Sequence, residues 1–322
     1  MKFRYALAVV VLLLIGTASH LYADTNNLNI VYASKEQGAQ ILAEKDDYLM
    51  AMSPMDRALR MHSNVEVSID DFTKFVSQFS LDWKPAEKEI LDSIFTELRP
   101  KFMDLKLHFP DTVFMVKTTG EDEGYSAYTR MNAIFIPDRY FGGAGSEEIS
   151  HTVTHELFHI LTRNNPEYVD DLYAVINFHK CNEIEFPESL KDKRGTNPDA
   201  PCNNHYVRLD NEGDSIDVVP ILYFDCELKD VSKDGFFLMF LKSGLMQIEK
   251  EKGEYHPKYV DDKPVIYEFL ELFSYFDAIG DNTGYIIHPE EILAENFVLV
   301  VDGNYGVSNP EIVEQLKAAM WK

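Results

Sequence analysis

Apolar residues recur at helical spacing through the first third of the chain, separated by short polar segments. Serine is a favoured N-cap, and Ser34, Ser53 and either Ser68 or Asp70 stand where such segments begin. The pattern predicts helices over 34–52, 53–61, 68–79 and 84–105. Pro100 is a candidate for a kink in the last of these helices. The region 24–110 is therefore predicted to be mainly helical.

The pattern changes at residue 112, where a short apolar run is typical of a β-strand. A second apolar run, 133–136, follows a turn-rich segment. We expect the two strands, 112–117 and 133–136, to form a small sheet whose edge borders the next helix. Such an edge could hold an extended peptide by β-addition, and the alternative is a purely structural hairpin.

The segment after this sheet, 146–162, has the composition of a buried helix. Ser146 is a good N-cap, and Glu147 and Glu148 place negative charge in the first turn, where the helix dipole favours it. Beyond it the pattern predicts a long irregular insertion at about 180–215. The remaining elements expected are a helix over 168–178, strand-like runs at 207–209 and 218–224, and helices over 265–276, 289–301 and 310–321. The chain is thus predicted to be an α+β protein with a second region at 111–322.

The first residues have the pattern of a secretory signal peptide. Lys2 and Arg4 precede an apolar run that ends at Ile15, and small residues lead to a plausible cleavage site before Asp24. The run is too short to span a membrane comfortably, and no cysteine lies near the cut. We therefore expect residues 1–23 to be removed. The mature protein would be secreted or periplasmic, with no stable membrane anchor.

Acidic residues outnumber basic ones throughout the chain, with 54 Asp and Glu against 30 Lys and Arg. Removal of residues 1–23 takes away two basic residues and leaves 28 against 54, a net charge near −26. Phosphate binding needs the opposite sign of charge, so nucleic acid and anionic membrane surfaces are excluded as expected partners. This charge favours metal ions and cationic substrates.

The chain contains three cysteines, Cys181, Cys202 and Cys226. In an exported protein, a disulfide between Cys181 and Cys202 is the first expectation, because the irregular segment between them would gain from a cross-link. The alternative is three unpaired, buried thiols. Their spacing does not fit a structural zinc site.

The predicted helix at 146–162 contains the pattern H-E-x-x-H at His155, Glu156 and His159. In a helix, His155 and His159 lie one turn apart on the same face, where two imidazoles can bind one metal ion. Glu156 lies beside them as a candidate base. His151, one turn earlier, is either a contact around the metal site or a helix-start residue near solvent.

A third ligand is needed, and the extended pattern H-E-x-x-H-x-x-G-x-x-H is excluded because Thr162 and Asn165 occupy its last two positions. The best candidate lies in the predicted helix at 289–301, where Glu291 and Glu295 are one turn apart with a small residue, Ala294, before Glu295. The alternative for this pair is a solvated helix face. Rival third ligands lie in the irregular insertion: Glu183, Glu185 and Glu188.

The two motifs together, H-E-x-x-H and a downstream E-x-x-A-E, resemble those of the gluzincin superfamily of zinc metallopeptidases. The resemblance covers only these two helices, and Glu295 stands where aspartate is more usual. It implies a zincin-like fold, one Zn²⁺ ion held by His155, His159 and Glu291, and Glu295 as the carboxylate that supports a ligand histidine. The distance of 132 residues between His159 and Glu291 is longer than in many such enzymes.

A zinc ion with three protein ligands retains a position for water and lowers the pKa of that water. Glu156 is the expected general base, which takes the proton from water and gives it to the leaving amine. A second group must stabilise the oxyanion. His205 is favoured for this role because it follows the longest irregular segment. The other candidates are Tyr206, His256, Tyr259 and Tyr285.

Two functions remain in competition on the sequence alone. The first is an exported zinc-dependent peptidase that acts on peptides or proteins. The second is a secreted, metallopeptidase-like binding protein that keeps zinc for structure and does not cleave. Glu156 favours the first, because a structural site needs the histidines but not this base.

Overall fold

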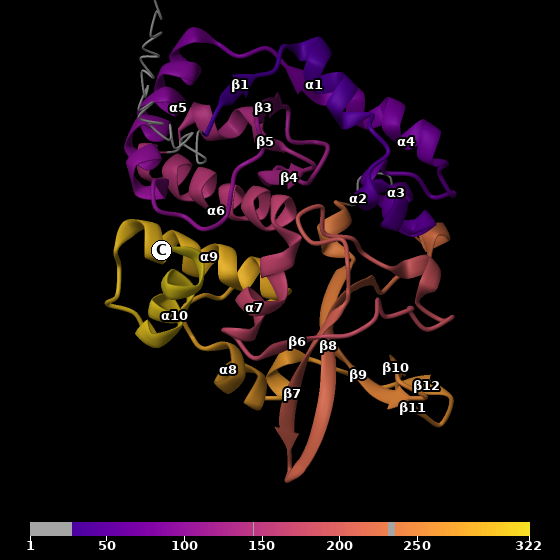
Figure 1. Ribbon diagram of the computed structural model, residues 1–322. Coiled ribbons are helices and arrows are strands. Elements are labelled where there is room, and N and C mark those ends of the chain that lie inside the picture. Colours follow the sequence, from indigo (N-terminus) through magenta and orange to yellow (C-terminus); the bar gives the residue numbers. More distant parts are fainter. Residues whose placement is uncertain (1–27, 144, 231–235) are drawn as a thin grey trace, which may run out of the picture.

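The computed structural model of the protein describes residues 28–143, 145–230 and 236–322 (Figure 1). The predicted signal peptide, 1–23, lies outside these residues. The described part combines many helices with small β-sheets, as expected for an α+β protein. None of the helices in this part is long and apolar enough to cross a membrane.

Serine side chains start three of the N-terminal helices as predicted. Ser34, Ser53 and Ser68 each accept a hydrogen bond from a backbone N–H three residues later. The helix predicted over 34–52 is instead two helices, because Asp46 caps a new one by accepting from the N–H of Leu49. These helices are α1 (Lys35–Leu42), α2 (Asp47–Ala51), α3 (Pro54–Arg60), α4 (Ile69–Val76) and α5 (Pro85–Leu98). After α5 the chain tightens into a 3₁₀ turn, Arg99–Phe102, which contains Pro100.

The first sheet has strands from both predicted regions. It contains β1 (Ile30–Tyr32), β2 (Ser80–Leu81), β3 (Val113–Thr118), β4 (Tyr128–Arg130) and β5 (Ala133–Pro137). Strands β1 and β5 pair in parallel with β3, and β4 is the antiparallel edge strand beyond β5. The two predicted strands are thus confirmed as β3 and β5, but they do not form a hairpin with each other; the hairpin is β4–β5. Because β1 belongs to this sheet, the position near residue 110 does not separate two cores.

Helix α6 (Ser146–Asn164) packs against β4 and β5 of the first sheet, and further helices lie below it (Figure 1). These are α7 (Val169–Ala174), α9 (Pro289–Asp302) and α10 (Pro310–Met320), whereas α8 (Ser274–Ile279) packs on the second sheet. Helix α6 begins after Gly145 as N-cap, without the predicted side-chain bond from Ser146. Helices α6 and α9 pack directly on each other, with the rings of Phe158 and Phe297 5.5 Å apart. This contact brings the two motif helices together.

The second sheet is elongated and extends away from the helices (Figure 1). Its strands are β6 (Phe178–Lys180), β7 (His205–Asn211), β8 (Asp214–Phe224), β9 (Leu241–Glu251), β10 (Glu254–Pro257) and β13 (Ile266–Tyr267), with a separate short pair β11 (Tyr259–Val260) and β12 (Lys263–Pro264). The irregular insertion is shorter than predicted and spans 181–204, because β7 begins at His205. The helix predicted over 265–276 is also wrong: β13, a 3₁₀ turn and α8 occupy this region.

The expected disulfide between Cys181 and Cys202 is absent from the described structure. No disulfide joins Cys181, Cys202 and Cys226 among the described residues. Cys181 packs against the apolar cluster beneath the second sheet, whereas Cys202 is exposed. The loop between them is held by hydrogen bonds instead, including one from the backbone N–H of Cys181 to the carbonyl of Asn204.

Candidate metal centre

Helices α6 and α9 bring three predicted ligands to one buried point. His155 and His159 come from α6 and Glu291 from α9, and all three are buried. The Nε2 atoms of the two imidazoles lie 3.1 Å and 3.5 Å from the same carboxylate oxygen, Oε2 of Glu291. The group could therefore hold a metal ion. The rival carboxylates in the irregular insertion are not part of it.

The far side of each imidazole is held by a carboxylate of α9. His155 Nδ1 lies 2.8 Å from Glu295, and His159 Nδ1 lies 3.0 Å from Glu290. A carboxylate only accepts hydrogen bonds, so each Nδ1 carries the hydrogen. The Nε2 atoms face the common point, where a metal ion could take the place of an Nε2 proton, as metal binding by histidine requires.

Glu295 occupies the place that the E-x-x-A-E pattern implies. It bonds His155 and also lies 3.2 Å from Nε2 of His151, so His151 contacts the surroundings of the site rather than the ligand point. Burial favours the neutral carboxyl, but hydrogen bonds from the two histidines outweigh burial and lower the pKa of Glu295 to about 2. Burial lowers the pKa of His155, yet hydrogen bonds to Glu291 and Glu295 raise it to about 10. The histidines of α6 are therefore closely paired with the carboxylates of α9.

Glu290 contacts a candidate ligand, His159, and the sequence did not single it out. Its carboxylate is 3% exposed and accepts hydrogen bonds from the hydroxyls of Tyr173, at 2.6 Å, and Thr162. It thereby fixes the ring of His159 from behind. Its position directly before Glu291 puts it on a different face of α9. Only knowledge of how α9 crosses α6 could have identified it.

Glu156 lies beside the three ligands and is 4% exposed. Burial raises its pKa to about 8, and the nearby charge of Asp199 adds to this effect. Its Oε2 atom and Nε2 of His159 are both buried without a hydrogen-bond partner in the described structure. Buried polar atoms rarely remain unpaired, so these two mark a place where a further ligand fits. Two imidazoles and a carboxylate form a donor set that suits zinc.

The irregular insertion also reaches the site. Asn197 donates its side-chain N–H to Oε1 of Glu291, and the carboxylate of Asp199 accepts from the backbone N–H of Thr129 at 2.6 Å and from its hydroxyl at 2.8 Å. Glu156, His159 and Asp199 form a second group whose ligand atoms all lie within 4.8 Å of one another. Sequence analysis missed Asn197 and Asp199, because an irregular segment gives no pattern for the direction of its side chains.

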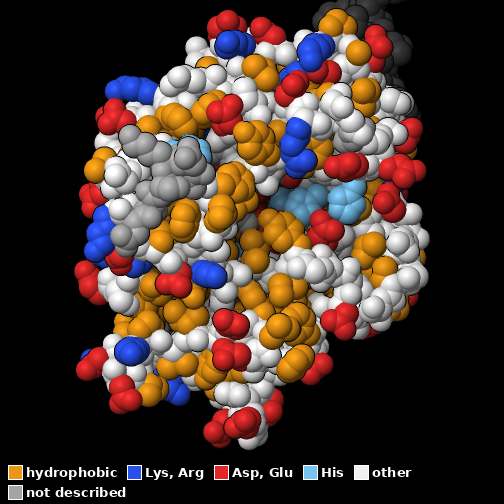
Figure 2. All heavy atoms as spheres, turned by 180° about the vertical axis from the view of Figure 1, so that it is seen from behind, with side chains coloured by type: hydrophobic (Ala, Val, Ile, Leu, Met, Phe, Trp, Pro, Cys, Tyr) orange, Lys and Arg blue, Asp and Glu red, His pale blue; other side chains and the backbone are white. Residues whose placement is uncertain are grey.

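A hollow of about 370 Å³ opens the site to solvent. Figure 2 shows histidine side chains near the centre of this face, with acidic side chains beside them. Its lining includes Ser126, Ala127, Glu156 and Tyr285. The ring of Tyr285 lies 6.0 Å from that of His155. Of the five candidates for an oxyanion-stabilising residue, Tyr285 is the one that the structure brings to this hollow.

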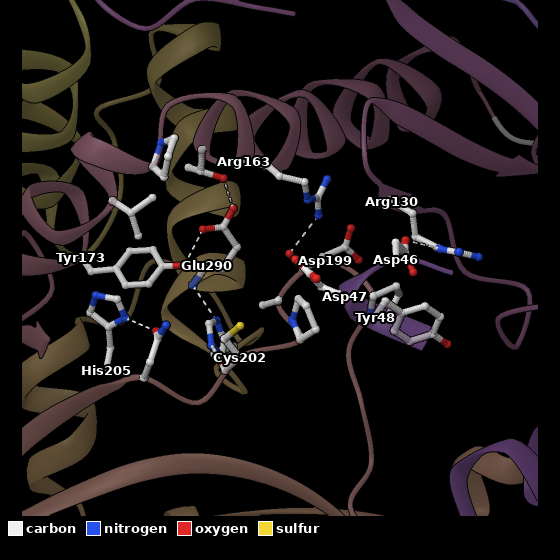
Figure 3. Close-up of a pocket in the computed structure, with 18 of the residues that line it drawn as sticks. Asp46, Asp47, Tyr48, Arg130, Arg163, Tyr173, Asp199, Cys202, His205 and Glu290 are labelled. Carbon is white, nitrogen blue, oxygen red and sulfur yellow. Dashed lines mark hydrogen bonds and ion pairs between the residues drawn. The ribbon is translucent and has the colours of Figure 1, made fainter. Parts of the chain in front are cut away.

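His205, the favoured candidate, lies elsewhere. It lines a separate hollow of about 320 Å³ together with Tyr173 and Glu290 (Figure 3). Its ring is bonded to Asp170 at 2.9 Å and to the Asn204 side chain at 2.7 Å. Burial lowers its pKa to about 4 despite the carboxylate of Asp170. The structure therefore places His205 behind the carboxylate that supports His159, and not beside Glu156.

Comparison of the chain with protein-family models, with curated proteins and with solved structures gives no match. The functional argument therefore depends on the residues of the site.

Proposed function

We propose that this protein is an exported zinc-dependent metallopeptidase of the gluzincin type. The observation that carries the proposal is the arrangement around Glu291. Nε2 of His155 and Nε2 of His159 both face its Oε2 atom, and the unpaired carboxylate oxygen of Glu156 lies beside them. A purely structural ion would require the three ligands His155, His159 and Glu291 but not Glu156.

The donors favour zinc over harder cations. Magnesium and calcium prefer six or more oxygen ligands, whereas two imidazoles with one carboxylate are typical of catalytic zinc sites. The carboxylates behind both rings add to this match, because metal-bound histidines usually donate their other N–H to such a group. We therefore assign one Zn²⁺ to His155, His159 and Glu291.

When bound, zinc supplies a Lewis acid that polarises a carbonyl and lowers the pKa of water. Glu156 takes a proton from the attacking water and passes it to the leaving amine. Its position beside the ligands, with one carboxylate oxygen unpaired, suits both steps. Tyr285 takes the role that the sequence favoured for His205, and its hydroxyl donates a hydrogen bond to the oxyanion.

The substrate is a peptide or a protein segment. Ser126 and Ala127, just before edge strand β4, line the same hollow as Glu156, and we infer that the main chain of a bound peptide contacts this segment. The large negative charge argues against nucleic acid as a partner. The signal-like pattern in residues 1–23 supports export to the periplasm or the medium.

One observation favours the non-cleaving alternative, a secreted binding protein with a structural zinc. The outward N–H of Thr129, on edge strand β4, is already bonded to Asp199. This contact covers part of the edge that an extended peptide would use. Glu156 has no role in that alternative, which is why we rank it second.

Three variants of the mature protein test the proposal: Glu156→Gln, Glu291→Gln and, as a matched control on the exposed start of α6, Glu148→Gln. Zinc content is measured by elemental analysis, and cleavage of a mixed peptide library by mass spectrometry. We expect one zinc in the parent, weakened zinc in Glu291→Gln, and retained zinc with a roughly 10²–10⁴-fold loss of cleavage in Glu156→Gln. Zinc without cleavage in the parent would support the binding protein, and no zinc would exclude both.

A further inference from the structure

We propose that Asn197, in the irregular segment 181–204, is a positioning residue for the third ligand, Glu291. It holds one carboxylate oxygen of Glu291 and leaves the other for the ion, which keeps a position at the ion open for water. The inference rests on the proposed zinc peptidase, because it concerns the same ion. It assigns a role at the site to a segment outside the two motif helices.

The two carboxylate oxygens of Glu291 have different surroundings. Oε2 lies 3.1 Å from Nε2 of His155 and 3.5 Å from Nε2 of His159. Oε1 accepts a hydrogen bond from the side-chain amide of Asn197. Glu291 is 1% exposed, and a hydrogen bond to a buried carboxylate is stronger than the same bond in water. The carboxylate is thus held with one oxygen at the ligand histidines and the other at the irregular segment.

The orientation of the Asn197 amide is fixed by a turn of its own backbone. Its Oδ1 atom accepts the backbone N–H of Asp199 at 3.0 Å, as in an Asx turn. A backbone N–H only donates, so the oxygen of the amide faces Asp199 and the NH₂ group faces Glu291. The same turn therefore determines which end of the amide contacts the ligand.

Helix α3 holds the residue before Asn197. The backbone N–H of Thr196 donates to Oδ2 of Asp56 at 2.9 Å, and the carbonyl of Thr196 accepts from Arg60 at 3.2 Å. All three residues are buried. Movement of the segment at this point would break buried hydrogen bonds, which is costly. Helix α3 thereby fixes the place from which Asn197 reaches Glu291.

The other end of the segment is tied to the start of α9. Nε2 of His288 donates to the carbonyl of Cys202 at 3.1 Å, and its Nδ1 accepts the backbone N–H of Glu290 at 3.1 Å. The segment is thus connected to the helix that carries Glu291. Asn197 lies between these two anchors, one on α3 and one on α9.

The hydrogen bond from Asn197 decides how many oxygens Glu291 offers to a metal ion. A carboxylate can bind a metal ion through one oxygen or through both. Catalytic zinc sites need a position for water beside three protein ligands. A free Oε1 could occupy that position. Because Asn197 holds Oε1, Glu291 binds through Oε2 alone and the position remains available to water.

The test compares two variants at position 197 with the parent. Asn197→Ala removes the donor to Glu291. Asn197→Asp also removes it but keeps an oxygen that can accept the N–H of Asp199. Asn182→Asp is the matched control, because Asn182 lies in the same segment and its side chain bonds the backbone N–H and carbonyl of Tyr255 in β10, at 2.7 Å and 3.0 Å.

Two measurements separate positioning from a general role in folding. Azide is titrated into the Co²⁺-loaded protein and followed by the visible spectrum, which reports whether the open position at the ion is accessible. Steady-state cleavage of a peptide from the library gives kcat and KM.

We expect both variants at position 197 to retain the metal, to bind azide about 10-fold or more weakly than the parent, and to lose about 10–100-fold in kcat at a similar KM. Asn182→Asp should match the parent. Parent-like azide binding or loss of the metal in Asn197→Ala would overturn this inference and leave the proposed peptidase intact, as would a parent-like kcat in Asn197→Asp. Metal binding without cleavage in the parent would contradict the peptidase, and azide binding would still decide this inference. A parent that binds no metal would overturn both.

Discussion

Two of the buried groups of charged residues differ in how their charges are balanced. In the first, the Arg60 group, Arg60 lies 2.7 Å from Asp56 and also pairs with Glu123, which accepts a further bond from Tyr48. In the second, the metal group, the ion pairs of Glu290, Glu291 and Glu295 are all with histidines. The first group contains a permanent cation, and the second does not.

The difference indicates which group needs a partner from outside the chain. A guanidinium remains charged at any accessible pH, so the Arg60 group is balanced by the protein itself. The charge of an imidazolium is a proton that a metal ion can displace, and the metal group adds Glu156 and Asp199 as further carboxylates. A divalent cation would supply the missing positive charge. The comparison thus separates an ion-pair cluster that the protein balances itself from a group that could hold a metal ion.

The largest effect is expected from Arg60→Met. Removing the guanidinium leaves Asp56 and Glu123 buried without their cation, which should lower the free energy of unfolding by about 3–5 kcal/mol. The loss should be present with and without a chelator, because the Arg60 group needs no metal. Urea unfolding followed by circular dichroism measures it. A loss below about 1 kcal/mol would contradict the view that this group is a stabilising ion-pair cluster.

The metal group should respond in the opposite way, by gaining stability from an added ion. Zinc at about 100 times its dissociation constant should raise the free energy of unfolding by about 2.7 kcal/mol. Urea unfolding with zinc and with a chelator gives the difference. Glu291→Gln should show little of this increment, and an equal increment in that variant would mean that zinc binds elsewhere.

His205 allows a test of pH dependence outside both groups. Burial lowers its pKa to about 4, whereas an unfolded histidine titrates near about 6.5. Between these values the unfolded chain binds more protons, so the free energy of unfolding should fall by roughly 2 kcal/mol as the pH decreases from 6.5 to 4. The stability from this residue is complete above pH 6.5. Urea unfolding at several pH values should show a shallower decrease for His205→Gln, and parallel curves would refute the assignment.

The smallest effect is expected from Tyr173→Phe. This change removes one hydroxyl that donates to Glu290, so we expect a loss of about 1 kcal/mol in the free energy of unfolding. Zinc affinity should fall by about 10-fold or less, because Thr162 still holds Glu290 and His159 remains in place. Urea unfolding and chelator competition measure the two effects. A loss of zinc affinity as large as that of Glu291→Gln would show that Glu290 does more than orient a ring.

The sequence could predict those parts of the site that depend on spacing within one helix. His155, Glu156 and His159 follow from helical periodicity, and Glu291 and Glu295 from one turn of a second helix. The helix starts at Ser34, Ser53 and Ser68 could be predicted equally well, because a capping bond forms between residues that are close in the sequence.

The remaining features depend on how distant elements meet. Glu290 supports His159 only because α9 crosses α6 at this level, and Asp199 reaches the site through a loop without periodicity. The sequence favoured His205 over Tyr285 as the oxyanion-stabilising residue, but Tyr285 is the one that lies in the hollow beside Glu156. The sequence could not indicate this, because it depends on how distant segments pack. The parallel pairing of β1 with β3, across more than 80 residues, likewise has no local pattern.

The separation of α6 and α9 along the chain has a consequence for folding. Glu291 follows His159 by 132 residues, and most of the second sheet lies between them in the sequence. A chain synthesised only as far as α6 therefore carries the two histidines but lacks the carboxylates that orient them. The group that could hold a metal ion can form only after the second sheet has been synthesised and α9 has packed on α6.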